Sequence, residues 1–148
     1  MIEEDLAGKN QRSSLFKTLF MAMAEDGAED WKTGIKLKID HSGAQDRIQF
    51  HHIFPKDLLK ANYSTAEIDD IANLAFISGK TNRQILNDFP AKYIPKLAQD
   101  FGGERFDHHL LPTLVPEELD IDAYPEFLRA RRVLLASRLN SFLGTAAQ

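Results

Sequence analysis

Cysteine is absent from the 148 residues of this chain. Its absence excludes disulfide bonds and thiolate zinc sites, and it is typical of proteins in the reducing cytoplasm, where we expect this one to act. No apolar run approaches the ~20 residues that a membrane-spanning helix requires. The first residues, Met1–Asp5, are acidic and lack the apolar stretch of a secretory signal. We therefore expect a cytoplasmic protein with no membrane association.

An excess of positive charge is also absent. The chain has 18 lysines and arginines against 22 aspartates and glutamates, a net charge of −4. Nucleic-acid-binding proteins usually carry a basic surface, so any such surface here must be local. With 43% apolar and 27% charged residues, the composition indicates an ordinary globular domain with a buried core.

The first half of the chain predicts one helix and two strands. Residues 1–12 are polar without periodicity, which suggests a frayed end or the remnant of a linker before a domain spanning residues 13–148. Apolar residues at helical spacing predict a helix from Ser13 or Ser14 to about Ala24. Alternating patterns predict strands at residues 35–39 and 47–52, with Ile48 and Phe50 facing inward.

The middle of the chain predicts a connection, a third strand and a short helix. Ser64-Thr65-Ala66-Glu67 has the form of a capping box, so a helix should begin there and run to about Ile71. Leu74–Ile77 is a short apolar strand, and residues 80–86 should form a short helix. The order of strand, connection, strand and short helix is that of a ββα unit.

The last third of the chain is predicted to be mostly helical. Pro90 starts a helix that Pro95 should interrupt or kink, and a short helix is expected at residues 106–111. An amphipathic stripe from Tyr124 to Phe142 predicts a final helix, closed by Gly144, with its arginines mostly on the other faces. The fold class we expect is α+β, with a two-stranded antiparallel sheet and a short helix embedded in a mostly helical domain.

The chemistry centres on Phe50-His51-His52-Ile53-Phe54-Pro55-Lys56. Two adjacent histidines end an apolar strand there, and proline then stops it. Imidazole can bind a metal ion, and it can accept a proton near neutral pH because its unperturbed pKa is ~6.5. Taken alone, such a pair is more often a satisfied polar pair than a site. The other histidines, His41, His108 and His109, receive no catalytic role, and the last two are interpreted as helix-end and packing residues.

Two downstream segments change this interpretation. They are Ile71-Ala72-Asn73-Leu74-Ala75-Phe76-Ile77 and Lys80-Thr81-Asn82-Arg83. Together with the His-His pair, they resemble the HNH endonucleases, the superfamily of ββα-metal nucleases. The resemblance implies that His51 is a metal ligand and His52 the general base. It also implies that Asn73 supports the catalytic loop and that Asn82 completes the metal site.

The same resemblance implies a cofactor and a substrate. One divalent ion, Mg²⁺ or Mn²⁺, would be held, with Zn²⁺ or Ni²⁺ as alternatives. The protein would hydrolyse DNA phosphodiester bonds, and Lys56, Lys80 and Arg83 are candidates for phosphate contact. Neighbours on a regular strand point to opposite faces, so we expect the backbone to leave the pleat at His51 and His52.

A narrower resemblance extends over about residues 13–142. Phe89-Pro90-Ala91-Lys92-Tyr93, His109-Leu110-Leu111-Pro112 and the segment from Tyr124 to Arg131 look like the C-terminal HNH domain of GmrSD-like restriction proteins. This implies a role in restriction or phage defence, with a ParB-like NTP-dependent domain or subunit that this chain lacks. Two alternatives stay open: a binding module with the HNH fold but no cleavage, and an unrelated hydrolase with a His-His metal centre.

Overall fold

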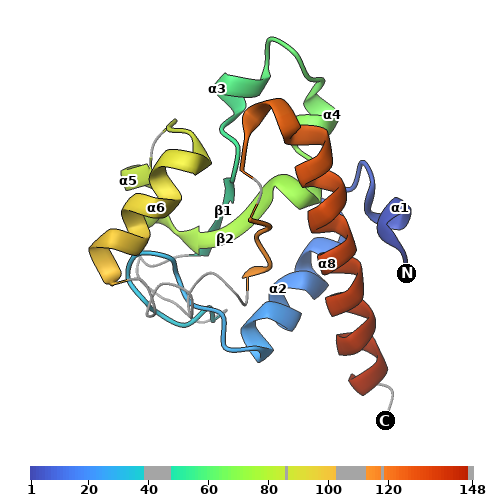
Figure 1. Cartoon of the computed structure of the whole chain (residues 1–148). Coiled ribbons are helices and arrows are strands. Elements are labelled where there is room, and N and C mark those ends of the chain that lie inside the picture. Colours follow the sequence, from blue (N-terminus) through green and yellow to red (C-terminus); the bar gives the residue numbers. More distant parts are fainter. Residues whose placement is uncertain (39–47, 86, 103–112, 118, 147–148) are drawn as a thin grey trace.

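The computed structural model describes residues 1–38, 48–85, 87–102, 113–117 and 119–146. Helices surround a small antiparallel sheet (Figure 1), which confirms the α+β class. The elements are α1 (Glu3–Leu6), α2 (Ser14–Glu25), β1 (Ile48–His52), α3 (Lys56–Leu59), α4 (Thr65–Ile68), η1 (Ile71–Asn73), β2 (Leu74–Ser78), α5 (Gly79–Ile85), α6 (Pro90–Phe101), η3 (Ile121–Ala123) and α8 (Tyr124–Ala146). Among these described helices, none is long and apolar enough to cross a membrane.

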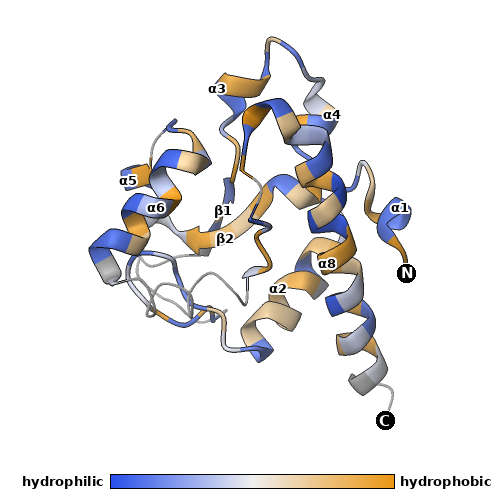
Figure 2. Cartoon of the chain, in the orientation of Figure 1, coloured by the Kyte–Doolittle hydropathy of each residue, from blue (hydrophilic) through white to orange (hydrophobic). Residues whose placement is uncertain are grey.

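The two strands of the sheet differ in burial. β1 pairs with β2 so that Phe50 lies opposite Phe76 and His51 opposite Ala75. All five residues of β2 are buried, and this apolar strand is mostly orange in Figure 2. β1 has β2 as its only partner in the described sheet. Phe50 is 38% exposed, so its expected inward position is wrong.

The connection between the strands holds α3, α4 and η1. Ser64 and Glu67 form the predicted capping box at the start of α4. The helix ends at Ile68 and does not reach Ile71 as expected. The reason is Asp70, whose extended backbone breaks the helix and whose side chain accepts a hydrogen bond from the amide of Ala72, starting η1.

The helices α2 and α8 contact each other and cover one side of the core. α2 begins after the N-cap Ser13, close to the predicted start. Most of the predicted apolar stripe is buried on α8, at Tyr124, Phe127, Leu128, Leu135 and Leu139. Leu134, which was also expected in the stripe, is 39% exposed, and Ala136 is buried as well. Figure 2 shows the alternation of apolar and polar residues along this helix. α8 continues to Ala146, so Gly144 lies within it and is not its cap.

Three further expectations differ from the structure. Residues 35–38 contain only an isolated bridge between Lys36 and Glu29, because no neighbouring described strand pairs with the rest of this alternating segment. Pro95 lies inside an uninterrupted α6. Residues 3–9 are not a frayed end: they pack against the rest of the domain, with Leu6 fully buried and the amide of Gly8 donating to Asp70. The predicted helix at 106–111 lies outside the described residues.

Arg131 of α8 is the largest departure from the expected surface position of the arginines. It is fully buried, and its guanidinium donates to the carbonyl oxygens of Ala72 at 2.7 Å and Leu74 at 2.6 Å. It also donates to the carbonyls of Thr113 and Leu114. Burial lowers the pKa of Arg131 to about 9, and nearby Tyr93 and Asp70 oppose this shift. Arg131 therefore stays charged at neutral pH and joins α8 to the start of β2.

Candidate functional site

His51 on β1 and Asn82 on α5 meet across the sheet edge. The Nδ1 atom of His51 lies 2.9 Å from the Oδ1 atom of Asn82. The other ring nitrogen of His51, Nε2, lies 3.3 Å from the hydroxyl of Tyr93 on α6. Two residues 31 positions apart in the sequence are thus brought into contact, because α5 packs on both strands directly after β2 ends.

His51 is nearly enclosed by aromatic rings. It is 5% exposed, and the rings of Trp31 and Tyr93 stand edge-on to it at centroid distances of 6.2 and 5.7 Å. Burial lowers the pKa of His51 to about 4; the hydrogen bond with Asn82 opposes this shift, and the charge of neighbouring His52 adds to it. His51 is therefore a neutral imidazole at physiological pH, the form that can bind a metal ion.

His52 forms a separate pair with a carboxylate. Its Nε2 atom lies 2.9 Å from Oδ1 of Asp69, the residue that follows α4. Because a carboxylate accepts, this contact places the proton of the neutral ring on Nε2 and leaves Nδ1 with its lone pair. The side chains of His52 and Asp69 are each 22% exposed, so solvent reaches the pair.

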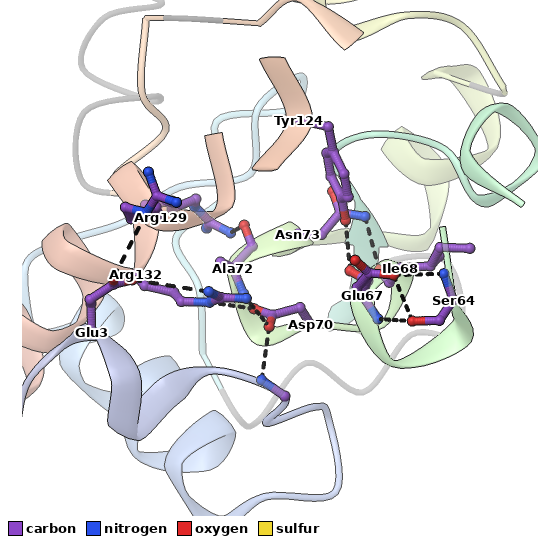
Figure 3. Close-up of polar contacts among 12 residues, drawn as sticks. Glu3, Ser64, Glu67, Ile68, Asp70, Ala72, Asn73, Tyr124, Arg129 and Arg132 are labelled. Atoms are coloured by element: carbon purple, nitrogen blue, oxygen red, sulfur yellow. Dashed lines mark hydrogen bonds and ion pairs between the residues drawn. The ribbon is translucent and has the colours of Figure 1, made fainter. Parts of the chain in front are cut away.

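Asn73 holds the segment that follows the histidines. Its Oδ1 atom accepts a hydrogen bond from the amide of Phe54 at 2.8 Å, and its Nδ2 atom donates to the carbonyls of Phe54 and Ile68. Its backbone carbonyl accepts from the amide of Ile53. Asn73 is the last residue of η1 and is fully buried, and Figure 3 shows it beside Ile68. It therefore fixes the chain immediately after His52 from within the core.

The helix that carries Asn82 is anchored by Asp30. One carboxylate oxygen of Asp30 accepts from the amide of Ser78 at 2.6 Å, and the other accepts from the hydroxyl of Thr81 at 2.6 Å. Burial raises the pKa of Asp30, but the hydrogen bonds from Ser78, Thr81 and Thr33 outweigh it, so the net pKa is lowered. An ionised Asp30 thus holds Ser78 and Thr81 in place at the start of α5, where the hydroxyl of Ser78 accepts from the amide of Thr81.

A depression of about 270 Å³ lies at this edge of the sheet. Its lining includes both histidines and Asn82, and two of the expected phosphate contacts, Lys56 and Arg83, lie there as well. Lys80 is exposed and is not among the lining residues. The complete lining is Phe50, His51, His52, Pro55, Lys56, Asn82, Arg83 and Asn87.

The backbone does not leave the pleat at the histidine pair. The register of β1 with β2 continues regularly through His52, so the expected distortion there is wrong. Both histidines nevertheless line the same depression, together with their strand neighbour Phe50. The chain departs from the strand only after His52, at Ile53.

The donor set for a metal ion is small. Within the described residues, no group of three histidine, aspartate or glutamate side chains gathers to hold a metal. The candidate ligands are one imidazole nitrogen of His51 and one amide oxygen of Asn82. His41, His108 and His109 lie outside the described part of the chain.

Three supporting residues escape sequence reasoning. Asp69 and Asp30 carry no distinctive local pattern, because each acts on a side chain or helix far away in the sequence. Tyr93 closes the segment Phe89–Tyr93, where the pattern indicates only an apolar helix position. A buried tyrosine needs a partner for its hydroxyl, and that requirement is the signal that could have found it.

Comparisons of the chain with protein-family models, with curated proteins and with solved structures found no significant match.

Proposed function

We propose that this protein is a metal-dependent endonuclease that hydrolyses DNA phosphodiester bonds, with β1, β2 and α5 as its ββα-metal unit. The observation that carries the proposal is the meeting of His51 with Asn82 at 2.9 Å beside the pair of His52 and Asp69. Both histidines border the same depression. The HNH resemblance gives His51, His52 and Asn82 their roles, and their arrangement is compatible with those roles.

The distance between His51 Nδ1 and Asn82 Oδ1 suits two ligands of one ion. One divalent ion would be held by these two atoms, each through a lone pair. The separation here is 2.9 Å. The neutral imidazole and the amide oxygen would supply two ligands, and water and phosphate oxygens would supply the rest. Mg²⁺ and Mn²⁺ are commonly bound in this way, by few protein ligands. When bound, such an ion stabilises negative charge on the phosphate and on the leaving oxygen.

His52 is the proposed general base. With its Nε2 proton donated to Asp69, its Nδ1 atom has the lone pair that takes a proton from the attacking water. As His52 becomes an imidazolium, the Asp69 carboxylate stabilises the new positive charge and holds the ring in one orientation. Asn73 acts through the backbone: it fixes Ile53 and Phe54, and hence the end of the strand from which His52 projects.

Lys56 and Arg83 are the proposed cationic contacts to the DNA backbone, because both border the depression. With a net charge of −4, the chain as a whole does not attract DNA. We therefore propose that a partner domain or subunit supplies most of the DNA affinity, in keeping with the resemblance to GmrSD-like restriction proteins and their ParB-like module.

A plasmid-nicking assay tests the proposal. We expect cleavage of supercoiled plasmid with Mg²⁺ or Mn²⁺ and none with EDTA. His52→Ala should lower the rate by about 10²–10⁴-fold, the usual cost of losing a general base. His41→Ala, which alters a histidine without an assigned role, is the matched control and should cut at the wild-type rate.

Two outcomes would contradict the proposal. Equal cleavage by His52→Ala and wild type would show that the nuclease activity does not come from this depression. DNA binding without cleavage, in every metal tested, would favour the alternative of a non-catalytic binding module.

A further inference from the structure

The contacts of the Tyr93 hydroxyl bear on which ring nitrogen of His51 carries the proton. The hydroxyl of Tyr93 lies 2.7 Å from the carbonyl oxygen of Ile53 and 3.3 Å from Nε2 of His51. A tyrosine hydroxyl has one proton to donate. The carbonyl can only accept, and it is also the nearer partner, so the proton of Tyr93 goes to Ile53.

The oxygen of Tyr93 is then an acceptor toward His51. A neutral imidazole carries one proton, on Nδ1 or on Nε2. Only the form with the proton on Nε2 can donate to the Tyr93 oxygen. With the proton on Nδ1 instead, the bare Nε2 atom would face the lone pairs of that oxygen in a buried site, where an unsatisfied polar contact is costly.

The opposite side of the His51 ring faces Asn82. With the proton on Nε2, the Nδ1 atom of His51 presents a lone pair to Asn82 Oδ1, which also presents lone pairs, at 2.9 Å. A metal ion held by both atoms would remove this repulsion. In the metal-free protein, a half-turn of the Asn82 amide lets its NH₂ group donate to Nδ1 instead of to Gln49 Oε1, its acceptor at 3.5 Å, so the same proton position on His51 remains satisfied.

We propose that Tyr93 is a positioning residue that keeps the proton of His51 on Nε2, so that Nδ1 is held ready as a metal ligand. This inference rests on the proposed function for the identity of the ligand. It adds a further helix, α6, to the candidate metal centre: β1 gives the imidazole, α5 gives the amide oxygen, and α6 sets which imidazole nitrogen is free. Partners of this kind typically contribute 10–100-fold to metal affinity.

The chain offers a matched control in Tyr124. Its hydroxyl also donates to a backbone carbonyl, that of Glu67 at 2.8 Å, and its side chain is buried as well, but its contacts lie away from His51. Tyr93→Phe and Tyr124→Phe each remove one hydroxyl that donates to a carbonyl. Any effect of lost stability should occur in both variants, whereas an effect on His51 should occur only in Tyr93→Phe.

The test is a long-range ¹H–¹⁵N correlation spectrum of the metal-free, ¹⁵N-labelled protein, which reports the proton position on each histidine ring. The signal of His51 is assigned by its loss in His51→Gln. We expect the proton on Nε2 in the wild type and in Tyr124→Phe. In Tyr93→Phe it should shift toward Nδ1, where Asn82 Oδ1 can accept it. Calorimetric titration with Mn²⁺ should show affinity about 10–100-fold weaker in Tyr93→Phe alone.

Two results would overturn the role of Tyr93. One is a wild-type His51 with its proton on Nδ1, which needs no variant at all. The other is a Tyr93→Phe protein with unchanged proton position and unchanged Mn²⁺ affinity. Because the spectrum needs neither metal nor DNA, it shows whether Tyr93 sets the proton position even if the protein cuts no DNA. Failure of the proposed function is therefore distinguishable from failure of this inference.

Discussion

Two polar regions of this protein border the same small sheet and are built in opposite ways. The support region consists of Asp70, Asn73, Arg131 and Arg132, where η1 meets α8. There the buried polar groups have protein partners: Asp70, for example, accepts from the amides of Gly8 and Ala72 and from Arg132 (Figure 3). The depression at His51, His52 and Asn82 is different, because two atoms that can both act as acceptors face one another there.

This difference suggests that the support region contributes mainly to stability and the depression mainly to binding and catalysis. A saturated network of buried hydrogen bonds rigidifies the fold, and removing one member leaves the others unsatisfied at high cost. A site that must bind a ligand cannot be saturated by the protein, so its residues contribute less to folding. We therefore expect variants in the support region to lose stability and variants in the depression to lose binding.

The largest expected effect is at Arg131. Replacing it by Met keeps the apolar stem but leaves four backbone carbonyls without their donor, so the free energy of unfolding should fall by about 3–5 kcal/mol. Arg129→Met is the control, because that side chain is 65% exposed and its contact with Glu3 is 4.0 Å long. Urea unfolding of both variants measures the difference. Equal stability of the two would mean that the carbonyls find other partners and that Arg131 does not join α8 to the sheet.

Asn73→Ala should have the next largest effect. It removes three buried hydrogen bonds to the backbone, and we expect a loss of about 2–4 kcal/mol in the free energy of unfolding. Asn140→Ala removes a single exposed bond, to the carbonyl of Met1, and should change stability by less than about 0.5 kcal/mol. If urea unfolding found Asn73→Ala as stable as Asn140→Ala, the connection would be held by other contacts.

The outcome of the sequence predictions follows the same division. Local signals predicted the capping box at Ser64, the start of α2 and the strand before Ser78, because each depends on neighbours within a few residues. The HNH resemblance implied that His51 and Asn82 lie together, and the structure brings them into contact. The strand expected at residues 35–39 is not formed over residues 35–38, because pairing depends on a partner strand that the alternating pattern cannot supply.

Buried charges were the hardest to predict. Arg131 stands on a helix with three other arginines, and nothing in the pattern distinguishes the one that points inward. Its partners are backbone carbonyls, which every residue has and which therefore leave no trace in the sequence. Asp30 is equally hard to recognise, since its partners Ser78 and Thr81 lie 48 and 51 residues away, at the start of α5.

Replacing Asp30 should have a smaller effect on the free energy of unfolding, and this effect should depend on pH. Its folded-state pKa is below the ordinary value of 3.8, so its ionised form adds stability above pH 3.8, and this contribution is lost as the pH falls through the lowered pKa. Asp30→Asn should therefore be less stable than wild type by about 1–3 kcal/mol at neutral pH. The gap should narrow below pH 3.8. Urea unfolding at several pH values measures this difference. If the difference in the free energy of unfolding between wild type and Asp30→Asn stayed constant from neutral pH to well below pH 3.8, the charge of Asp30 would not be what stabilises the start of α5.

The smallest effect on stability is expected at Asn82. The Asn82→Ala variant best separates the depression, where metal binding should be lost, from the support region, where stability should be lost. Asn82 is partly exposed, and its contacts are to His51 and, at 3.5 Å, to Gln49. Asn82→Ala should change the free energy of unfolding by less than about 1 kcal/mol. Its affinity for Mn²⁺ in calorimetric titration should nevertheless fall by at least the 10–100-fold expected for a supporting residue, because a direct ligand is lost. The support-region variant Asn73→Ala, measured at a temperature where it is folded, should keep more of its Mn²⁺ affinity than Asn82→Ala. The opposite ranking, with Asn82→Ala the less stable of the two and equal to wild type in Mn²⁺ affinity, would place Asn82 in the structural network and remove it from the metal site.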